Sequence, residues 1–134
     1  MIGYVTLGSN DIPRAAAFYD ELLKLLGAGR FMESETMVAW AVSLDKPALG
    51  VIKPYDGKPA SSGNGVMVAL VVDSNAKVDE VHRKAIALGG KDEGAPGPRG
   101  TDGFYAGYFR TSMDTRSTAT AGRPADRSAG RSVG

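Results

Sequence analysis

The stretch Met67–Gly90, MVALVVDSNAKVDEVHRKAIALGG, combines a short apolar run with a helical pattern, and the chain contains it twice. When Met67 is laid on Tyr4, the stretch aligns without a gap with Tyr4–Gly27, YVTLGSNDIPRAAAFYDELLKLLG. Leu88 then falls on Leu25, near the end of each apolar stripe. This internal similarity indicates a duplicated module.

The first half of the chain predicts a βαβββ module over residues 1–54. Residues 2–8 alternate between the two faces of a strand, and Asn10 and Asp11 offer side-chain acceptors for a helix start. Apolar residues then recur at helical spacing until Gly27. Three short strands are expected to follow, at 30–33, 37–43 and 49–53.

The second half predicts the same module over residues 66–110, after a linker at 55–65 that is rich in Gly, Ser and Pro. The apolar run 66–72 indicates a strand buried on both faces, and Asp73 or Ser74 is expected to cap the next helix. Residues 91–102, with GAPGPRG at their centre, are expected to form a loop before a strand at 103–110. A closing strand near 112–116 should follow, but its apolar pattern is absent.

Together these patterns predict an α+β fold with two βαβββ modules whose helices lie outside a curved mixed sheet around a cleft. The last strand of the second module is expected to be missing or replaced. We treat residues 1–110 as a single domain and 111–134 as an aberrant low-complexity tail, rich in Ser, Thr, Ala, Gly and Arg.

Composition restricts the possible partners. Sixteen Lys and Arg residues face fifteen Asp and Glu residues, so no general basic field favours nucleic acid or a membrane surface. The chain has no cysteine, which excludes disulfides and thiolate chemistry. Without a signal-like start or a long apolar run, the sequence predicts a cytoplasmic protein that binds a small organic molecule.

The two βαβββ modules, the opening YVTLGSNDIPRAAAFYDELLKLLG, and VDEVHRKAIALGG followed by GAPGPRG and GFYAGYFR resemble the vicinal oxygen chelate superfamily over residues 1–110. This superfamily includes glyoxalases, bleomycin-resistance proteins and extradiol dioxygenases. The resemblance implies a scaffold that hosts many chemistries, so activity has to be argued from the site. It also implies dimers, and an unpaired sheet edge beside residues 103–110 would favour pairing with another chain.

In metal-dependent members of the superfamily, the first and last strands of each module supply His, Gln or Glu ligands to a divalent metal. The resemblance places Tyr4 and Met67 at the first-strand positions, and residues 49–53 contain no carboxylate or histidine. Neither a phenol nor a thioether is a usual ligand for such an ion. We therefore predict no metal site and no cofactor, although a divalent metal is the default of the family.

The side chains expected to line the cleft are those that share a face of the predicted strands with Tyr4. The residues expected to contact a ligand there are Tyr4, Thr6, Trp40, Met67, Tyr108 and Arg99. Aromatic side chains would supply contact area, and Arg99 would meet an anionic group. The alternatives are that the apolar residues fill a dry core and that Arg99 is only solvated.

No residue is assigned a catalytic role from the sequence. The only histidine, His82, lies in the second predicted helix among apolar residues. We expect a packed structural histidine, with a general base as the alternative.

The tail departs from the superfamily directly after Arg110, where members usually continue Arg-Asp-Pro/Leu-Asp-Gly-Asn into the last strand. The codons of Met113 and Asp114 force a glycine when they are read one base earlier, and the neighbouring codons permit Asp-Leu-Asp before it and His after it. We therefore expect a frameshift, caused by loss of one base after the Arg110 codon. The alternative is a genuine low-complexity tail.

These observations favour a small-molecule-binding protein of the glyoxalase and bleomycin-resistance type that lacks the usual metal ligands. The alternative is a lyase or isomerase of glyoxalase type, which is metal-free or uses metal ligands that the sequence does not reveal. A homodimer is expected in either case.

Overall fold

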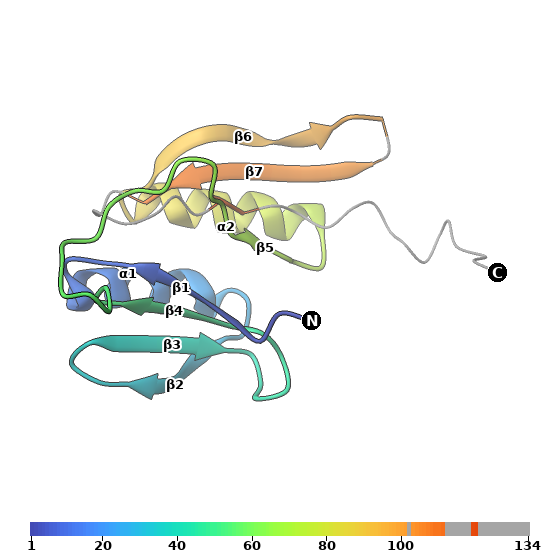
Figure 1. Ribbon diagram of the computed structural model, residues 1–134. Coiled ribbons are helices and arrows are strands. Elements are labelled where there is room, and N and C mark those ends of the chain that lie inside the picture. Colours follow the sequence, from blue (N-terminus) through green and yellow to red (C-terminus); the bar gives the residue numbers. More distant parts are fainter. Residues whose placement is uncertain (102, 112–118, 121–134) are drawn as a thin grey trace. The chain divides into compact units, whose positions relative to one another are not determined.

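The structure is a computed structural model that describes residues 1–101, 103–111 and 119–120. These residues form two compact units, one built from residues 1–66 with Thr111 and the other from residues 67–110 with 119–120. The element order is βαβββ in each unit, so the predicted α+β class and both modules are confirmed (Figure 1).

The first unit is a mixed four-stranded sheet with one helix. The sheet order is β1-β4-β3-β2, in which β1 and β4 are parallel and the other pairs are antiparallel. Residues on α1 that face the sheet are apolar and buried, so the helix covers one face of the sheet (Figure 1). The elements are β1 (Tyr4–Gly8), α1 (Ile12–Lys24), β2 (Gly29–Glu33), β3 (Met37–Ala41) and β4 (Ala48–Ile52).

The helix boundaries follow from local chemistry. The side chain of Asp11 accepts a hydrogen bond from the backbone N–H of Arg14 at 3.2 Å, and Ser74 does the same for Lys77 at the start of the second helix. Gly27 has a φ of 78°, a conformation that favours glycine and ends the first helix. Within the described chain, neither helix is long and apolar enough to cross a membrane.

The second unit repeats the order of the first. A parallel pair, β5 and β8, is matched by an antiparallel pair, β6 and β7, and β8 also lies next to β7. The neighbours in the second unit, β5-β8-β7-β6, thus correspond to β1-β4-β3-β2 in the first unit. The elements are β5 (Ala69–Leu70), α2 (Asn75–Ala87), β6 (Lys91–Arg99), β7 (Phe104–Arg110) and β8 (Ala119–Thr120).

The loop prediction for residues 91–102 is wrong for most of that segment, because Lys91–Arg99 forms β6. Its glycines and prolines argued against a strand. The structure accommodates them by two irregularities in the pairing with β7, and β7 is the one strand that pairs with β6 in the described part of the chain. Prolines are tolerated at such an edge because the missing N–H is not needed there.

The strand predicted at 66–72 is also shorter than expected. Only Ala69 and Leu70 pair, and burial alternates after them: Val72 is buried, whereas Val71 is 77% exposed. The prediction of a strand buried on both faces is therefore wrong. A run of β-branched residues gave the same signal that a doubly covered strand would give.

The place of the last strand in the second unit is taken by the two-residue strand β8, which comes from the tail. Its pairing with β5 is parallel, like that of β4 with β1. The residues on which the frameshift prediction rests, 112–118, and the rest of the tail, 121–134, lie outside the described residues.

Candidate functional site

The helix-free face of the first unit's sheet carries a hollow of about 490 Å³. All four strands of this sheet contribute to its lining, together with the connection between β3 and β4. A volume of this size suits a small organic molecule, since ligand pockets commonly measure about 300–1,000 Å³.

Strand register gives this hollow a floor of small residues. Thr6 pairs with Gly50, and Gly50 pairs with Ala39 on the next strand. Tyr4 pairs in the same way with Ala48. Because residues opposite one another in a sheet share a face, the middle of the floor carries only hydrogen atoms, methyl groups and the Thr6 hydroxyl.

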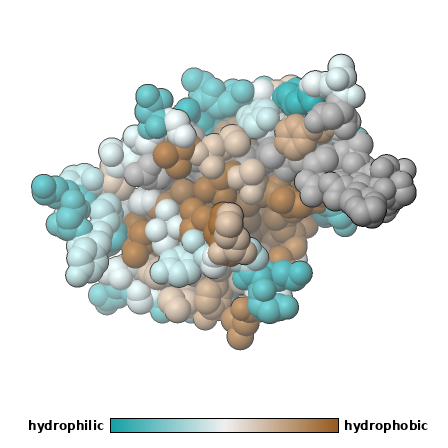
Figure 2. Space-filling view, turned by 45° about the vertical axis from the view of Figure 1, so that its right-hand side comes forward, coloured by the Kyte–Doolittle hydropathy of each residue, from teal (hydrophilic) through white to brown (hydrophobic). Residues whose placement is uncertain are grey.

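Larger side chains surround this floor. Tyr4 is 70% exposed, and Phe31 and Met32 are about half exposed, so they stand at the border of the hollow. Figure 2 shows exposed apolar side chains gathered on the face of the molecule turned to the viewer. The polar groups among the lining residues are the hydroxyls of Tyr4, Thr6 and Ser43 and the ammonium of Lys46.

Trp40, predicted to share the cleft with Tyr4, lies on the other face of the sheet. It is 2% exposed, and its ring centroid lies 5.7 Å from that of Tyr19 on α1. The prediction is wrong because β3 pairs with β4 in a register that places Ala39, not Trp40, in line with Thr6.

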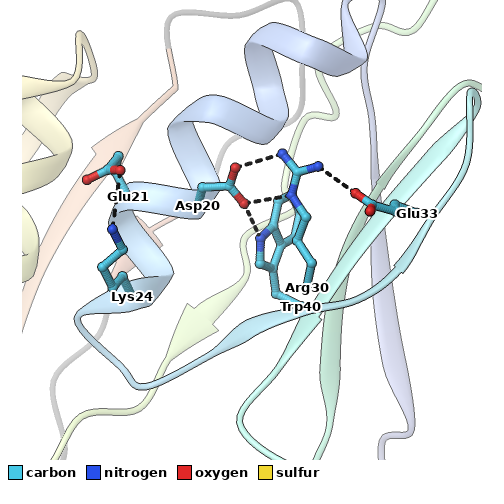
Figure 3. A network of polar contacts seen from close by, with 6 residues as sticks. All are labelled: Asp20, Glu21, Lys24, Arg30, Glu33 and Trp40. Carbon is cyan, nitrogen blue, oxygen red and sulfur yellow. Dashed lines mark hydrogen bonds and ion pairs between the residues drawn. The ribbon is translucent and has the colours of Figure 1, made fainter.

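A polar network fixes Trp40 in this position (Figure 3). Asp20 of α1 accepts a hydrogen bond from Trp40 Nε1 at 2.8 Å and two from Arg30, at 2.8 and 2.7 Å. Arg30 also donates to Glu33 at 2.8 Å. The Arg30 guanidinium, helped by the Trp40 N–H, lowers the pKa of Asp20 against the opposing effect of burial. The carboxylates of Asp20 and Glu33 in turn raise the pKa of Arg30.

The second unit brings two other predicted site residues together. The guanidinium carbon of Arg99 lies 5.3 Å from the centre of the Tyr108 ring, which is a cation–π distance. Arg99 also donates to the carbonyl of Ala95 at 2.6 Å. Met67, the sixth predicted residue, is 51% exposed and precedes β5. Tyr4 and Thr6 thus line the hollow of the first unit, whereas these three belong to the second unit.

His82 connects α2 to the β6–β7 pair. Its Nε2 lies 3.2 Å from Asp92 Oδ1 and 3.1 Å from the carbonyl oxygen of Tyr108. The side chain is buried, and a Cβ at Gly107 would come within 3.2 Å of its ring. The backbone N–H of Gly94 donates a hydrogen bond to the Asp92 carboxylate, and this bond is the largest cause of the lowered pKa of Asp92. The contact with His82 lowers that pKa further. This placement is that of a packed, hydrogen-bonded residue.

The residues present do not fit the divalent metal that the family resemblance implies. At the family's ligand positions in the first unit stand the phenol of Tyr4 and the apolar strand Ala48–Ile52. Among the described residues, no group of three or more His, Cys, Asp and Glu side chains is close enough together to hold an ion. Phenol and aliphatic groups do not form the donor set that such a metal needs.

Sequence reasoning missed part of the hollow, including Phe31, Lys46 and the small residues of its floor. A signal for the floor was present: residues 38–41 and 48–51 alternate small with large side chains. The large ones pack toward α1, so the small ones had to face the other way. Lys46 and Phe31 carried no such periodic signal.

Comparison with known proteins agrees with this architecture. The family model of the Glyoxalase/Bleomycin resistance protein/Dioxygenase superfamily matches residues 1–112. A glyoxalase/bleomycin resistance protein from Albidiferax ferrireducens T118 has a similar structure, with a TM-score of 0.80 and 31% identity over 92% of this chain and 99% of that chain.

Two further structures are similar in fold at lower identity. A glyoxalase-related enzyme from Fulvimarina pelagi has a TM-score of 0.71 and 19% identity, covering 92% of this chain and 88% of its own. A lactoylglutathione lyase from Agrobacterium tumefaciens has a TM-score of 0.61 and 20% identity, covering 90% and 92%. No curated protein matches the chain. The family match and the first similar structure together establish that the chain belongs to the glyoxalase/bleomycin resistance protein/dioxygenase superfamily.

Proposed function

We propose that this chain is a small-molecule-binding protein of the superfamily that works without the usual metal. The observation that carries the proposal is the hollow on the helix-free face of the first sheet, with its apolar floor and a few polar groups at its border. Apolar concave surfaces with a small number of oriented polar groups are typical of ligand sites.

The methionines of the chain provide a direct test. Met32 and Met37 line the hollow, whereas Met1 and Met67 do not. Protein labelled with ¹³C at the methionine methyls is titrated with a panel of small aromatic and aliphatic compounds. We expect the Met32 and Met37 signals to shift and those of Met1 and Met67 to stay unchanged.

A matched pair of glycine substitutions locates the binding. A Cβ at Gly50 would lie 3.4 Å from the Met37 methyl, so Gly50→Leu extends a side chain into the hollow. Gly29→Leu is the control, because a Cβ there meets nothing within 4 Å and Gly29 does not line the hollow. Gly50→Leu should abolish the titration and Gly29→Leu should retain it. Equal binding by both variants would contradict the proposal.

A glyoxalase-type lyase or isomerase is the competing function. Metal analysis of the purified protein tests its metal-dependent form: stoichiometric, tightly bound Zn²⁺, Ni²⁺ or Fe²⁺ would overturn the metal-free proposal. Turnover of a hemithioacetal substrate that is lost on chelation would do the same.

We also propose that the protein is a cytoplasmic homodimer, since assembly through a second copy is common for such scaffolds. Light scattering across a range of protein concentrations tests the assembly. A monomer mass that does not depend on concentration would contradict it.

We propose, finally, that residues 111–134 result from a single-base loss after the Arg110 codon. The family match supports this, because it ends at residue 112. Sequencing of the coding DNA tests it: insertion of one base at that point should restore Arg-Asp-Leu-Asp-Gly and a short apolar strand. If no such frame exists, the tail is genuine.

A further inference from the structure

The shape of the hollow restricts what it can hold. Its floor consists of Gly50 flanked by Ala39 and Thr6, with Ala48 beside them, and the Met37 methyl lies close to Gly50, so only small groups cover its middle. The Tyr4 and Phe31 rings and the Met32 side chain stand around it. A flat floor with aromatic borders suits a planar ring system, because rings stack on flat apolar surfaces and against aromatic edges.

The charge of the hollow restricts the ligand further. Among the described residues that line it, Lys46 is the one charged residue and none is a carboxylate. Within the described chain, the ammonium of Lys46 forms no ion pair. The neighbouring carboxylate of Asp45 accepts a hydrogen bond from Ser43 instead. A cation without a protein partner at the border of an apolar site favours a ligand that brings a negative charge.

We infer that the ligand is a planar organic anion, such as an aromatic carboxylate, whose ring lies on the Gly50–Ala39 floor and whose charge meets Lys46. This inference rests on the proposed binding function and specifies its ligand class. Thr6 supplies a hydroxyl group that can donate to the same anion.

The test compares three probes by the methionine-methyl titration. The probes are 2-naphthoate, its neutral analogue 2-naphthamide, and adamantane-1-carboxylate, which carries the same charge on a bulky, non-planar body. We expect 2-naphthoate to bind about fivefold more tightly than the amide, which corresponds to one solvent-exposed charge pair at contact distance. The adamantane probe should bind more weakly than 2-naphthoate.

Two lysine variants test whether Lys46 causes the preference for the anion. Lys46→Gln should remove the difference between 2-naphthoate and 2-naphthamide, whereas Lys58→Gln, a linker position outside the hollow, should preserve it. Added salt should weaken only the anion, because it screens the pair.

Equal affinities of acid and amide, or an unchanged preference in Lys46→Gln, would overturn the anion inference while the proposed binding function stands. Tight binding of the adamantane probe would overturn the planar shape. Binding of neither naphthyl compound would also overturn the inference, and the Gly50→Leu comparison on the wider panel then decides the binding function separately.

Discussion

The two halves of the chain hold their helices against their strands with different chemistry. In the first unit, the carboxylate of Asp20 accepts hydrogen bonds from Trp40 and Arg30, so a charged pair lies beside a buried indole. In the second unit, the imidazole of His82 meets the Asp92 carboxylate and a backbone carbonyl of β7. His82 and Tyr19 occupy equivalent positions of the repeat, yet His82 contacts a carboxylate and a carbonyl whereas the Tyr19 ring packs against Phe18 and Trp40.

Duplication therefore preserved the βαβββ frame and the apolar stripe of the helix. It did not preserve the polar contacts between the helix and the strands. The stripe positions tolerate any apolar residue of suitable volume. A buried polar group needs a specific partner, so each half acquired its own. The predictions below test whether the two sets of contacts differ in strength as well as in kind.

The largest effect is expected at Trp40. Replacement by alanine empties a site that is 2% exposed and should lower the free energy of unfolding by about 3–5 kcal/mol. Urea denaturation followed by circular dichroism measures this. Tyr55→Ala, at a fully exposed aromatic residue, is the control and should change the free energy by less than about 0.5 kcal/mol. Similar losses in both variants would contradict the buried position of Trp40.

Asp20→Ala should cost about 1–3 kcal/mol, because it leaves the buried Trp40 N–H without its acceptor and removes the two hydrogen bonds that Arg30 donates to Asp20. The Arg30 pair itself adds little to this, since both side chains are more than a third exposed. Glu21→Ala, which breaks an exposed pair with Lys24 on the same helix, should cost less than about 0.5 kcal/mol. The fluorescence of Trp40, the chain's single tryptophan, reports both transitions.

His82→Phe keeps an aromatic ring at this position and removes the polar contacts in the second unit. We expect a loss of about 1 kcal/mol, because the Asp92 carboxylate is about half exposed and water replaces its bond to His82. Amide hydrogen exchange should accelerate in α2 and β7. If α1 responds as strongly as α2, the contacts of the two halves are not separate.

Acid should weaken the first unit through Asp20. Because its folded-state pKa is lowered below the unfolded value of about 3.9, its contribution is present above that value and is lost as the pH falls through the folded pKa. Denaturation midpoints between pH 6 and pH 2 measure the loss. Asp20→Asn should show a shallower pH dependence, and an equally steep one would assign the effect to other carboxylates such as Asp92, whose pKa is lowered as well.

Much of the frame was predictable because period and caps are local signals. The repeat, the Asp11 and Ser74 caps and the strands at 37–41 and 104–110 all follow from residue spacing. The site was less predictable, because it depends on strand register, and a shift of one residue exchanges the two faces. Trp40 was misplaced for this reason, while Tyr4 and Thr6 lie in the hollow.

Strand β6 was missed because its composition argues against a strand, and that same composition protects the folded protein. Pro96 and Pro98 have no N–H to offer, and Gly94, at a φ of 157°, coincides with an irregularity in the ladder. An incoming chain therefore finds no continuous row of donors along this border. At the high concentrations of a crowded cell, such a border resists templated aggregation through the chemistry of its backbone.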